Sequence, residues 1–459
     1  MSKQSPVGTT PSSWPVRGYL LFILCLAVLI YLASPPVQFA GSQQSSTTSA
    51  SARNAALIAA TEEVLKETSA LRQLSVMRPV QSSALSRAEI EHAVIKNLDE
   101  DTSAADVHAA EVTMKKLGLA PADFQYRALM IRLLTEQVAG YYEPKTRQFH
   151  LADWIDVDGQ RPVMAHELTH ALQDQHFDLR RFEHWPKGDS DAELAAHALI
   201  EGDATLAMVM YVSSNPARVL TFLKSLGAMG VDTKELDQAP RAIRESLLFP
   251  YQEGLNWTRA LYNYKQGGWS QVSDAFATLP QSTEQIMHPE KYFAHEAPMK
   301  VTLPDITNLL NTGSKSASAA KGEVNWKRLL TDVNGEWGTY LLLDQFLKSP
   351  AESHRAAAGW GGDRYAVYES SAGGVVFLSV SMWDSDDEAR EFYEAYLKRT
   401  EARYPGVDAL PLSSQSGQEG KRFRTTEGEV IIELRGNRVN VIEGMPEPVE
   451  AKIRKLLAA

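Results

Sequence analysis

The spacing of hydrophobic and polar positions changes along the chain, and each spacing predicts a different kind of element. Between residues 53 and 138 apolar residues recur every three to four positions, as in amphipathic helices. Residues 140–153 alternate apolar and polar positions around the turn at Glu143–Pro144, which predicts a β-hairpin. Helical spacing resumes at Pro162 and continues to about residue 347. This part of the chain is therefore expected to be mainly helical, with one small hairpin.

About the last hundred residues have shorter, strand-like patterns. They predict two strands, a helix, a hairpin turning at Gly436–Asn437 and a closing helix, at residues 363–369, 374–383, 384–404, 429–444 and 446–458. This order of elements is typical of a compact α+β module. Trp360, Trp383 and Tyr396 are expected in its core. The linker 349–362 is the predicted boundary on its N-terminal side.

Residues 18–34 are apolar almost throughout and carry no charge, while Lys3 and Arg17 lie upstream. A segment of about 17 apolar residues can just span a bilayer, and the positive charges before it place its N-terminus in the cytoplasm. We therefore expect a single-pass membrane protein whose body is exported and which meets the lipid bilayer through this segment. A cleaved signal peptide, giving a secreted protein, is the alternative, although Pro35–Pro36 disfavours a cleavage site.

These patterns predict five regions along the chain. They are a cytoplasmic N-terminus, a transmembrane anchor, a flexible Ser/Thr-rich linker, a main domain and a C-terminal α+β domain, at residues 1–17, 18–34, 35–52, 53–350 and 355–459.

Composition narrows the possible chemistry. The chain has 459 residues, a net charge of −11 and one cysteine, Cys25. An acidic chain without clustered Lys and Arg argues against a nucleic-acid partner. A single cysteine excludes an intrachain disulfide and any cysteine-rich zinc site. Metal ligands would therefore have to be His, Asp or Glu.

The stretch HELTH, residues 166–170, has the pattern H-E-x-x-H. On a helix, positions i and i+4 lie about 40° apart, so His166 and His170 can bind one metal ion. Glu167 points about 100° away from His166 and would reach a water molecule bound to that ion as general base. Pro162 suits the first turn of such a helix. The alternative is a helix that carries two histidines and a glutamate by chance.

These residues resemble the zincin metallopeptidases, and the hairpin upstream would supply the edge strand on which such enzymes align an extended substrate. His176 stands ten residues after His166, as does the third ligand of the metzincins, H-E-x-x-H-x-x-G-x-x-H. Here Gln173 replaces the Gly that turns the chain. In a continuing helix, His176 would lie about 9 Å beyond His170 and about 240° around the axis, too far to bind the same ion.

The third ligand is therefore expected on the helix predicted over residues 191–212. Glu193, His197 and Glu201 fall on one stripe of that helix, so any of them could face the metal. Glu201 is favoured because Gly202 and small residues after it would let this helix approach the HELTH helix closely.

His-Glu-x-x-His followed by Glu on a later helix resembles the gluzincin branch of the zincins. Thr205 stands where thermolysin-like enzymes carry Asp, which suggests an uncharacterised bacterial gluzincin family. The resemblance implies a mainly α zincin-like domain with a small hairpin, followed by the α+β domain. It also implies Zn²⁺ held by His166, His170 and Glu201, with Glu167 as catalytic base.

Three further residues are candidates for supporting roles. His288 and Tyr292 could stabilise the tetrahedral intermediate, although His288–Pro289 could equally just end a helix. Asp203 could orient a ligand histidine, or could lie on a solvated helix face.

The function expected from these features is a membrane-anchored zinc metallopeptidase acting on protein or peptide substrates. Two alternatives stay open: a non-catalytic envelope protein that keeps zinc for structure, and a hydrolase of a non-peptide amide. Intact Glu167 favours the peptidase over the structural alternative, because a structural zinc site needs no base.

Overall fold

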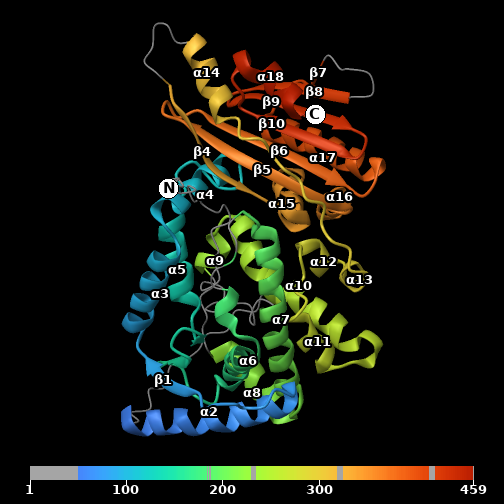
Figure 1. Ribbon diagram of the computed structural model, residues 1–459. Coiled ribbons are helices and arrows are strands. Elements are labelled where there is room, and N and C mark those ends of the chain that lie inside the picture. Colours follow the sequence, from blue (N-terminus) through green and yellow to red (C-terminus); the bar gives the residue numbers. More distant parts are fainter. Residues whose placement is uncertain are drawn as a thin grey trace, which may run out of the picture.

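The computed structural model describes residues 50–182, 185, 188–228, 234–317, 324–412 and 419–457. Within these residues the chain is an α+β protein, with a mainly helical N-terminal part and a C-terminal part built on a large sheet (Figure 1). The predicted cytoplasmic segment 1–17, the anchor 18–34 and the linker up to residue 49 lie outside the described residues.

The N-terminal part begins with helices that pack around a small sheet. These first elements are α2 (Ala50–Arg72), β1 (Gln81–Leu85), α3 (Arg87–Asp101), α4 (Ala104–Lys116) and α5 (Tyr126–Gln137). Ser86 and Ser103 start α3 and α4 with capping boxes, in which the serine and an acidic residue three positions later satisfy each other's backbone N–H groups. The helical expectation for residues 53–138 was wrong at β1.

The predicted hairpin is present as β2 (Gly140–Glu143) and β3 (Gln148–Ala152). The sheet order is β1-β3-β2, with β1 parallel to β3 and β2 antiparallel to it. Strand β2 thus lies at one edge of this three-stranded sheet.

Three long helices form the centre of the N-terminal part: α6 (Arg161–Phe177), α7 (Ser190–Ser213) and α10 (Arg241–Asn263). Helices α7 and α10 are in very close contact, because a Cβ atom on Gly202 would lie 2.2 Å from the Gly254 carbonyl oxygen. Gly202 was expected to let α7 approach α6. That expectation was wrong, since the glycine faces α10 instead.

Shorter helices surround this centre and lead to the C-terminal part. They are η2 (Leu179–Phe182), α8 (Pro216–Ala228), α9 (Lys234–Gln238), η3 (Tyr264–Gln266), α11 (Trp269–Ala275), α12 (Thr283–Met287), α13 (Pro289–Phe293) and α14 (Thr307–Ala317).

The C-terminal part is an antiparallel sheet of order β4-β5-β6-β10-β9-β8-β7. The strands are β4 (Trp326–Asp332), β5 (Trp360–Ser370), β6 (Val375–Trp383), β7 (Leu410–Pro411), β8 (Glu419–Thr425), β9 (Gly428–Arg435) and β10 (Arg438–Glu443). Its helices are α15 (Gly335–Leu347), α16 (Pro350–Ala357), α17 (Asp386–Arg403) and α18 (Glu447–Leu457). Helices α14 and α18 share a core with one face of the sheet.

The other face of the sheet, covered by α15 and α17, belongs to the same hydrophobic core as α3, α4 and α5. The two parts of the chain are therefore packed together. Trp360, Trp383 and Tyr396 are buried, as expected for core residues.

The structure differs from the predicted boundary between the two parts. The expected linker 349–362 forms α16 and the start of β5, while β4, within the expected main domain 53–350, pairs with β5. The sheet therefore recruits a strand from before residue 349. Strands β4, β7 and β8 were not predicted.

Among the described residues, none of the helices combines the length and the apolar character needed to cross a membrane. This finding contradicts the predicted single-pass membrane location. The predicted anchor itself, residues 18–34, lies outside the described residues.

Candidate metal centre

Three side chains meet between α6 and α7. His166 Nε2 lies 3.0 Å from Glu201 Oε2 and 3.0 Å from His170 Nε2, and His170 Nε2 lies 3.4 Å from Glu201 Oε2. Bonds of about 2.0–2.1 Å to a tetrahedral zinc would separate neighbouring ligand atoms by roughly 3.3 Å. The three atoms therefore have the spacing of three corners of such a site.

The burial and charge of these side chains also fit a cation. His166 is 2% exposed, and His170 and Glu201 are fully buried. Burial opposes ionisation of Glu201, but the two imidazoles outweigh it and hold the pKa of its carboxyl at about 2. Glu201 Oε1 is buried and has no hydrogen-bond partner within the described residues. An anionic oxygen without a donor, beside two imidazole nitrogens, is a set that a metal ion satisfies.

A hydrogen-bonded chain supports His170 from behind. His170 Nδ1 lies 2.8 Å from Gln173 Oε1, and the Gln173 amide donates to Asp203 Oδ2 at 2.8 Å and to the Ile200 carbonyl at 3.0 Å. Asp203 in turn forms a fully buried ion pair with Arg72 of α2. The NH₂ group of Gln173 donates to acceptors on α7. The Gln173 oxygen therefore faces the imidazole of His170 and keeps its proton on Nδ1. In the neutral imidazole Nε2 then carries no proton, as metal binding requires.

Sequence reasoning placed Asp203 near the ligands but missed the roles of Gln173 and Arg72. Gln173 stood out only because it replaces a glycine of another zinc peptidase pattern. Its position three residues after His170, on the same helix face, was the signal that could have identified it. Arg72 is 131 residues away from Asp203, and no local pattern connects them.

Glu167 lies beside the edge strand β2. It is fully buried, and its Oε2 accepts a hydrogen bond of 2.9 Å from the backbone N–H of Tyr142. The Tyr142 hydroxyl donates to Asp174, one turn after His170. In the sequence analysis Tyr142 entered only as part of the predicted hairpin, residues 140–153. Tyr251 of α10, which sequence reasoning did not single out, packs its ring along His166 with centroids 6.1 Å apart.

The other histidines considered as ligands lie elsewhere. Helix α6 continues through His176, whose Nε2 lies 2.8 Å from the Ser75 carbonyl oxygen. His197 is buried one turn before Glu201, and burial lowers the pKa of its imidazole to about 4. Within the described part of the chain, His176, His197 and Glu193 are not grouped with the metal-ligand set.

His288 is not brought to the metal centre. Its Nε2 lies 2.9 Å from Glu336 of α15, and this hydrogen bond raises the pKa of the imidazole. The same segment meets α7 through Thr283, whose hydroxyl donates to Asp191. Asp191 precedes Glu201 by ten residues, or roughly 15 Å of helix. The predicted role of His288 in stabilising the intermediate is therefore unsupported, and it pairs with a buried carboxylate instead.

Tyr292 is likewise occupied elsewhere, since its hydroxyl donates to the Thr278 carbonyl at 2.8 Å. A second acidic group, Glu284, Glu296 and Asp384, surrounds the Lys291 ammonium at 2.6 to 2.8 Å. Lys291 thus already supplies the positive charge that these three carboxylates could otherwise take from a metal ion.

A family model described as a domain of unknown function (DUF8575) matches residues 325–454. The match begins at β4 and so agrees with the sheet as the structural unit, but it leaves out every residue of the candidate metal centre. No curated protein and no solved structure matches the chain.

Proposed function

We propose that this protein is a zinc-dependent peptidase of the gluzincin type, with His166, His170 and Glu201 as metal ligands and Glu167 as general base. The observation that carries the proposal is the convergence of three ligand atoms within 3.4 Å of one another, with Glu167 on the adjacent position of the same helix. Two histidines and one carboxylate leave a fourth position for water, as in catalytic zinc sites.

Zinc bound there would supply Lewis acidity, which lowers the pKa of water towards about 7 and polarises a carbonyl. Glu167 would accept the proton of the attacking water and return it to the leaving nitrogen. The hydrogen bond from Tyr142 N–H to Oε2 keeps this carboxylate in place. Gln173 keeps the proton of His170 on Nδ1.

The edge of β2 suits the binding of an extended chain. The Tyr142 N–H reaches Glu167 and so points away from β3, its partner strand. In an antiparallel pair the N–H and C=O of one residue point the same way, and residues two apart share a direction. The carbonyls of Gly140 and Tyr142 therefore face the same edge, where a peptide backbone could donate to them.

A second candidate function is a non-catalytic protein that keeps the metal for structure. One observation favours it: the ligands and Glu167 are at most 2% exposed, whereas a substrate must reach a catalytic metal. Removal of the metal separates the two functions. A chelator should abolish hydrolysis with a modest change in melting temperature if the metal is catalytic, and should unfold the N-terminal part if it is structural.

The decisive variant is Glu167→Gln in the full-length protein. It preserves the shape of the side chain and the hydrogen bond from Tyr142, so zinc content should stay at one per chain while casein hydrolysis falls by at least about 10²-fold. Glu111→Gln is the matched control, because Glu111 of α4 also accepts a backbone N–H, from Tyr126, and lies outside the proposed site; it should keep both properties. Casein hydrolysis by Glu167→Gln at the wild-type rate would rule out the mechanism.

A further inference from the structure

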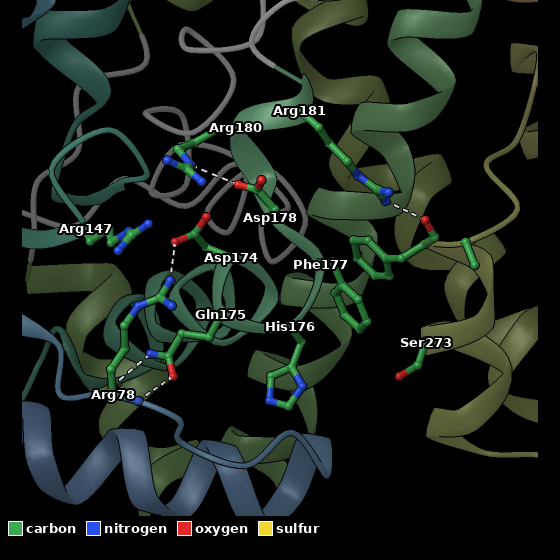
Figure 2. Close-up of a pocket in the computed structure, with 12 residues that line it drawn as sticks. Arg78, Arg147, Asp174, Gln175, His176, Phe177, Asp178, Arg180, Arg181 and Ser273 are labelled. Carbon is green, nitrogen blue, oxygen red and sulfur yellow. Dashed lines mark hydrogen bonds and ion pairs between the residues drawn. The ribbon is translucent and has the colours of Figure 1, made fainter.

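A cavity of about 490 Å³ lies at the C-terminal end of α6, one to two turns beyond His170. Six charged residues line it: Arg78, Arg147, Asp174, Asp178, Arg180 and Arg181. Figure 2 shows Arg78, Arg147 and Arg180 around Asp174 and Asp178 on one side of the cavity, with Arg181 apart from them on the side of Phe177. This volume would hold a side chain and part of the adjoining backbone of a peptide.

The cavity carries an excess of positive charge. Arg78 pairs with Asp174 at 2.9 Å, and Arg180 pairs with Asp178 at 2.8 Å. Arg147 and Arg181 have no carboxylate partner among the described residues, although Arg181 donates to the Phe276 carbonyl. Two guanidinium charges thus remain, in a chain whose net charge is −11. Arginine forks of this kind bind carboxylates well.

Tyr142 connects the cavity to the candidate metal centre. Its backbone N–H contacts Glu167, and its hydroxyl donates to Asp174 in the cavity wall at 2.9 Å. Arg147 follows directly in the β2–β3 turn, where its N–H donates to the Glu143 carbonyl. Strand β2 therefore runs from the proposed base towards Arg147.

The separation is short enough for one substrate to reach both places. Asp174 follows His170 by four residues on α6, and Asp178, eight residues after His170, caps the end of that helix, which places them roughly 6 and 12 Å along its axis. An extended peptide advances about 3.3 Å per residue. A chain lying on β2 would enter the cavity two to four residues from the cleaved bond.

We propose that this cavity is a specificity subsite for a carboxylate of the peptide substrate, either an acidic side chain or the free C-terminus, held by Arg147. The inference rests on the proposed peptidase function, whose site it extends. On the other side of the cavity, Phe177 and Phe276, whose rings stack on each other with centroids 4.2 Å apart, provide an apolar wall for the rest of the substrate chain.

The test uses four synthetic peptides that differ by one group: glutamate or glutamine at a position three residues from the cleaved bond, each with a free or an amidated C-terminus. Cleavage by the zinc-loaded wild-type protein gives kcat/KM, and calorimetry with Glu167→Gln gives Kd without cleavage. We expect at least about tenfold tighter binding of the peptide with the correctly placed carboxylate, since a hydrogen-bonded charge pair commonly gives such a factor.

Arg147→Gln should reduce that tenfold ratio to about one, mainly through KM, whereas Arg181→Gln, on the other side of the cavity, should leave most of it in place. Arg127→Gln is the matched control, because Arg127 is an exposed arginine on α5 that pairs with Asp99. It removes the same charge outside the cavity and should leave the ratio unchanged.

Each outcome decides the inference. Equal binding of all four peptides, or a preference that survives Arg147→Gln, would overturn the subsite, and so would an equal loss in Arg127→Gln. The peptide of the set that binds best shows whether an acidic side chain or the free C-terminus supplies the carboxylate. Tight, Arg147-dependent binding without any cleavage would retain the subsite and reject the peptidase.

Discussion

The two parts of the molecule each contain a fully buried pair of arginine and carboxylate, and the pairs serve different ends. Arg72–Asp203 in the N-terminal part leads through Gln173 to the proposed ligand His170. Arg399–Glu443 in the C-terminal part leads to Tyr396 and to the Leu117 carbonyl at the end of α4. The same interaction thus orients a candidate reactive group in one part and fastens two packed layers in the other.

The comparison shows that burial of charge alone does not identify a functional site. What distinguishes the first pair is its end point, a group of three side chains, Glu201 among them, that could hold a metal ion. The second pair ends in hydrogen bonds that are already complete around Glu443, which also contacts Arg403. Removing either pair should therefore cost stability, but only the first should affect metal binding.

The largest expected effect is the loss of stability when the Arg399–Glu443 pair is broken. Glu443→Ala leaves Arg399 buried without its partner, so unfolding should require about 3–5 kcal/mol less free energy. Zinc content should not change. Denaturant unfolding and metal analysis measure the two quantities. Glu427→Ala, which removes an exposed partner of Arg403, is the control and should cost at most about 1 kcal/mol. Loss of zinc in Glu443→Ala would contradict the separation of roles.

The second effect concerns the contact between the N-terminal and the C-terminal part. Asp363 accepts hydrogen bonds from the N–H groups of Asn334 and Gly335, and Gly335 packs against Asp191 of α7. Burial raises the pKa of Asp363 to about 6. In the unfolded chain the Asp363 carboxyl therefore ionises at a lower pH than in the folded protein. Its contribution to the free energy of unfolding is present below about pH 4 and is lost as pH rises to about 6.

Asp363→Asn should remove that part of the pH dependence. Relative to wild type, its free energy of unfolding should rise by about 2–3 kcal/mol between pH 4 and pH 6.5, since one pKa unit corresponds to 1.36 kcal/mol. Measuring both proteins at each pH cancels the contributions of the other groups. A constant difference across the range would show that Asp363 is not held protonated.

A smaller effect is expected behind the metal ligands. Gln173→Leu removes the hydrogen bond to His170 Nδ1, so zinc affinity should fall by about 10–100-fold. Gln175→Leu is the control on the same helix, because Gln175 binds the N–H groups of Met77 and Arg78 and not a ligand. Competition with a chelator of known affinity measures both. Equal zinc affinity in the two variants would remove Gln173 from the site.

The sequence could predict the candidate ligands because they depend on helix periodicity. Pro162 and the run of helix formers through Gln173 predict a helix that continues past His176, and α6 spans Arg161–Phe177. The stripe containing Glu201 follows from the same spacing. These relations are local, so no knowledge of the tertiary structure was needed.

Relations between distant segments could not be predicted in this way. Strand β1 has five residues, QSSAL, and its pairing with β3 creates it. Strand β4 was assigned to the helical domain because its pattern is short and its partner β5 lies beyond two helices. Gly202 correctly signalled close packing, but a glycine does not say which helix it meets.

Anomalous diffraction at the zinc absorption edge, from crystals of the purified full-length protein, tests the central claim most directly. We predict one peak about 2 Å from each of His166 Nε2, His170 Nε2 and Glu201 Oε2, beside the Glu167 carboxylate. No peak between α6 and α7, or a peak bound by His176 or His197 in place of Glu201, would contradict the proposed metal centre.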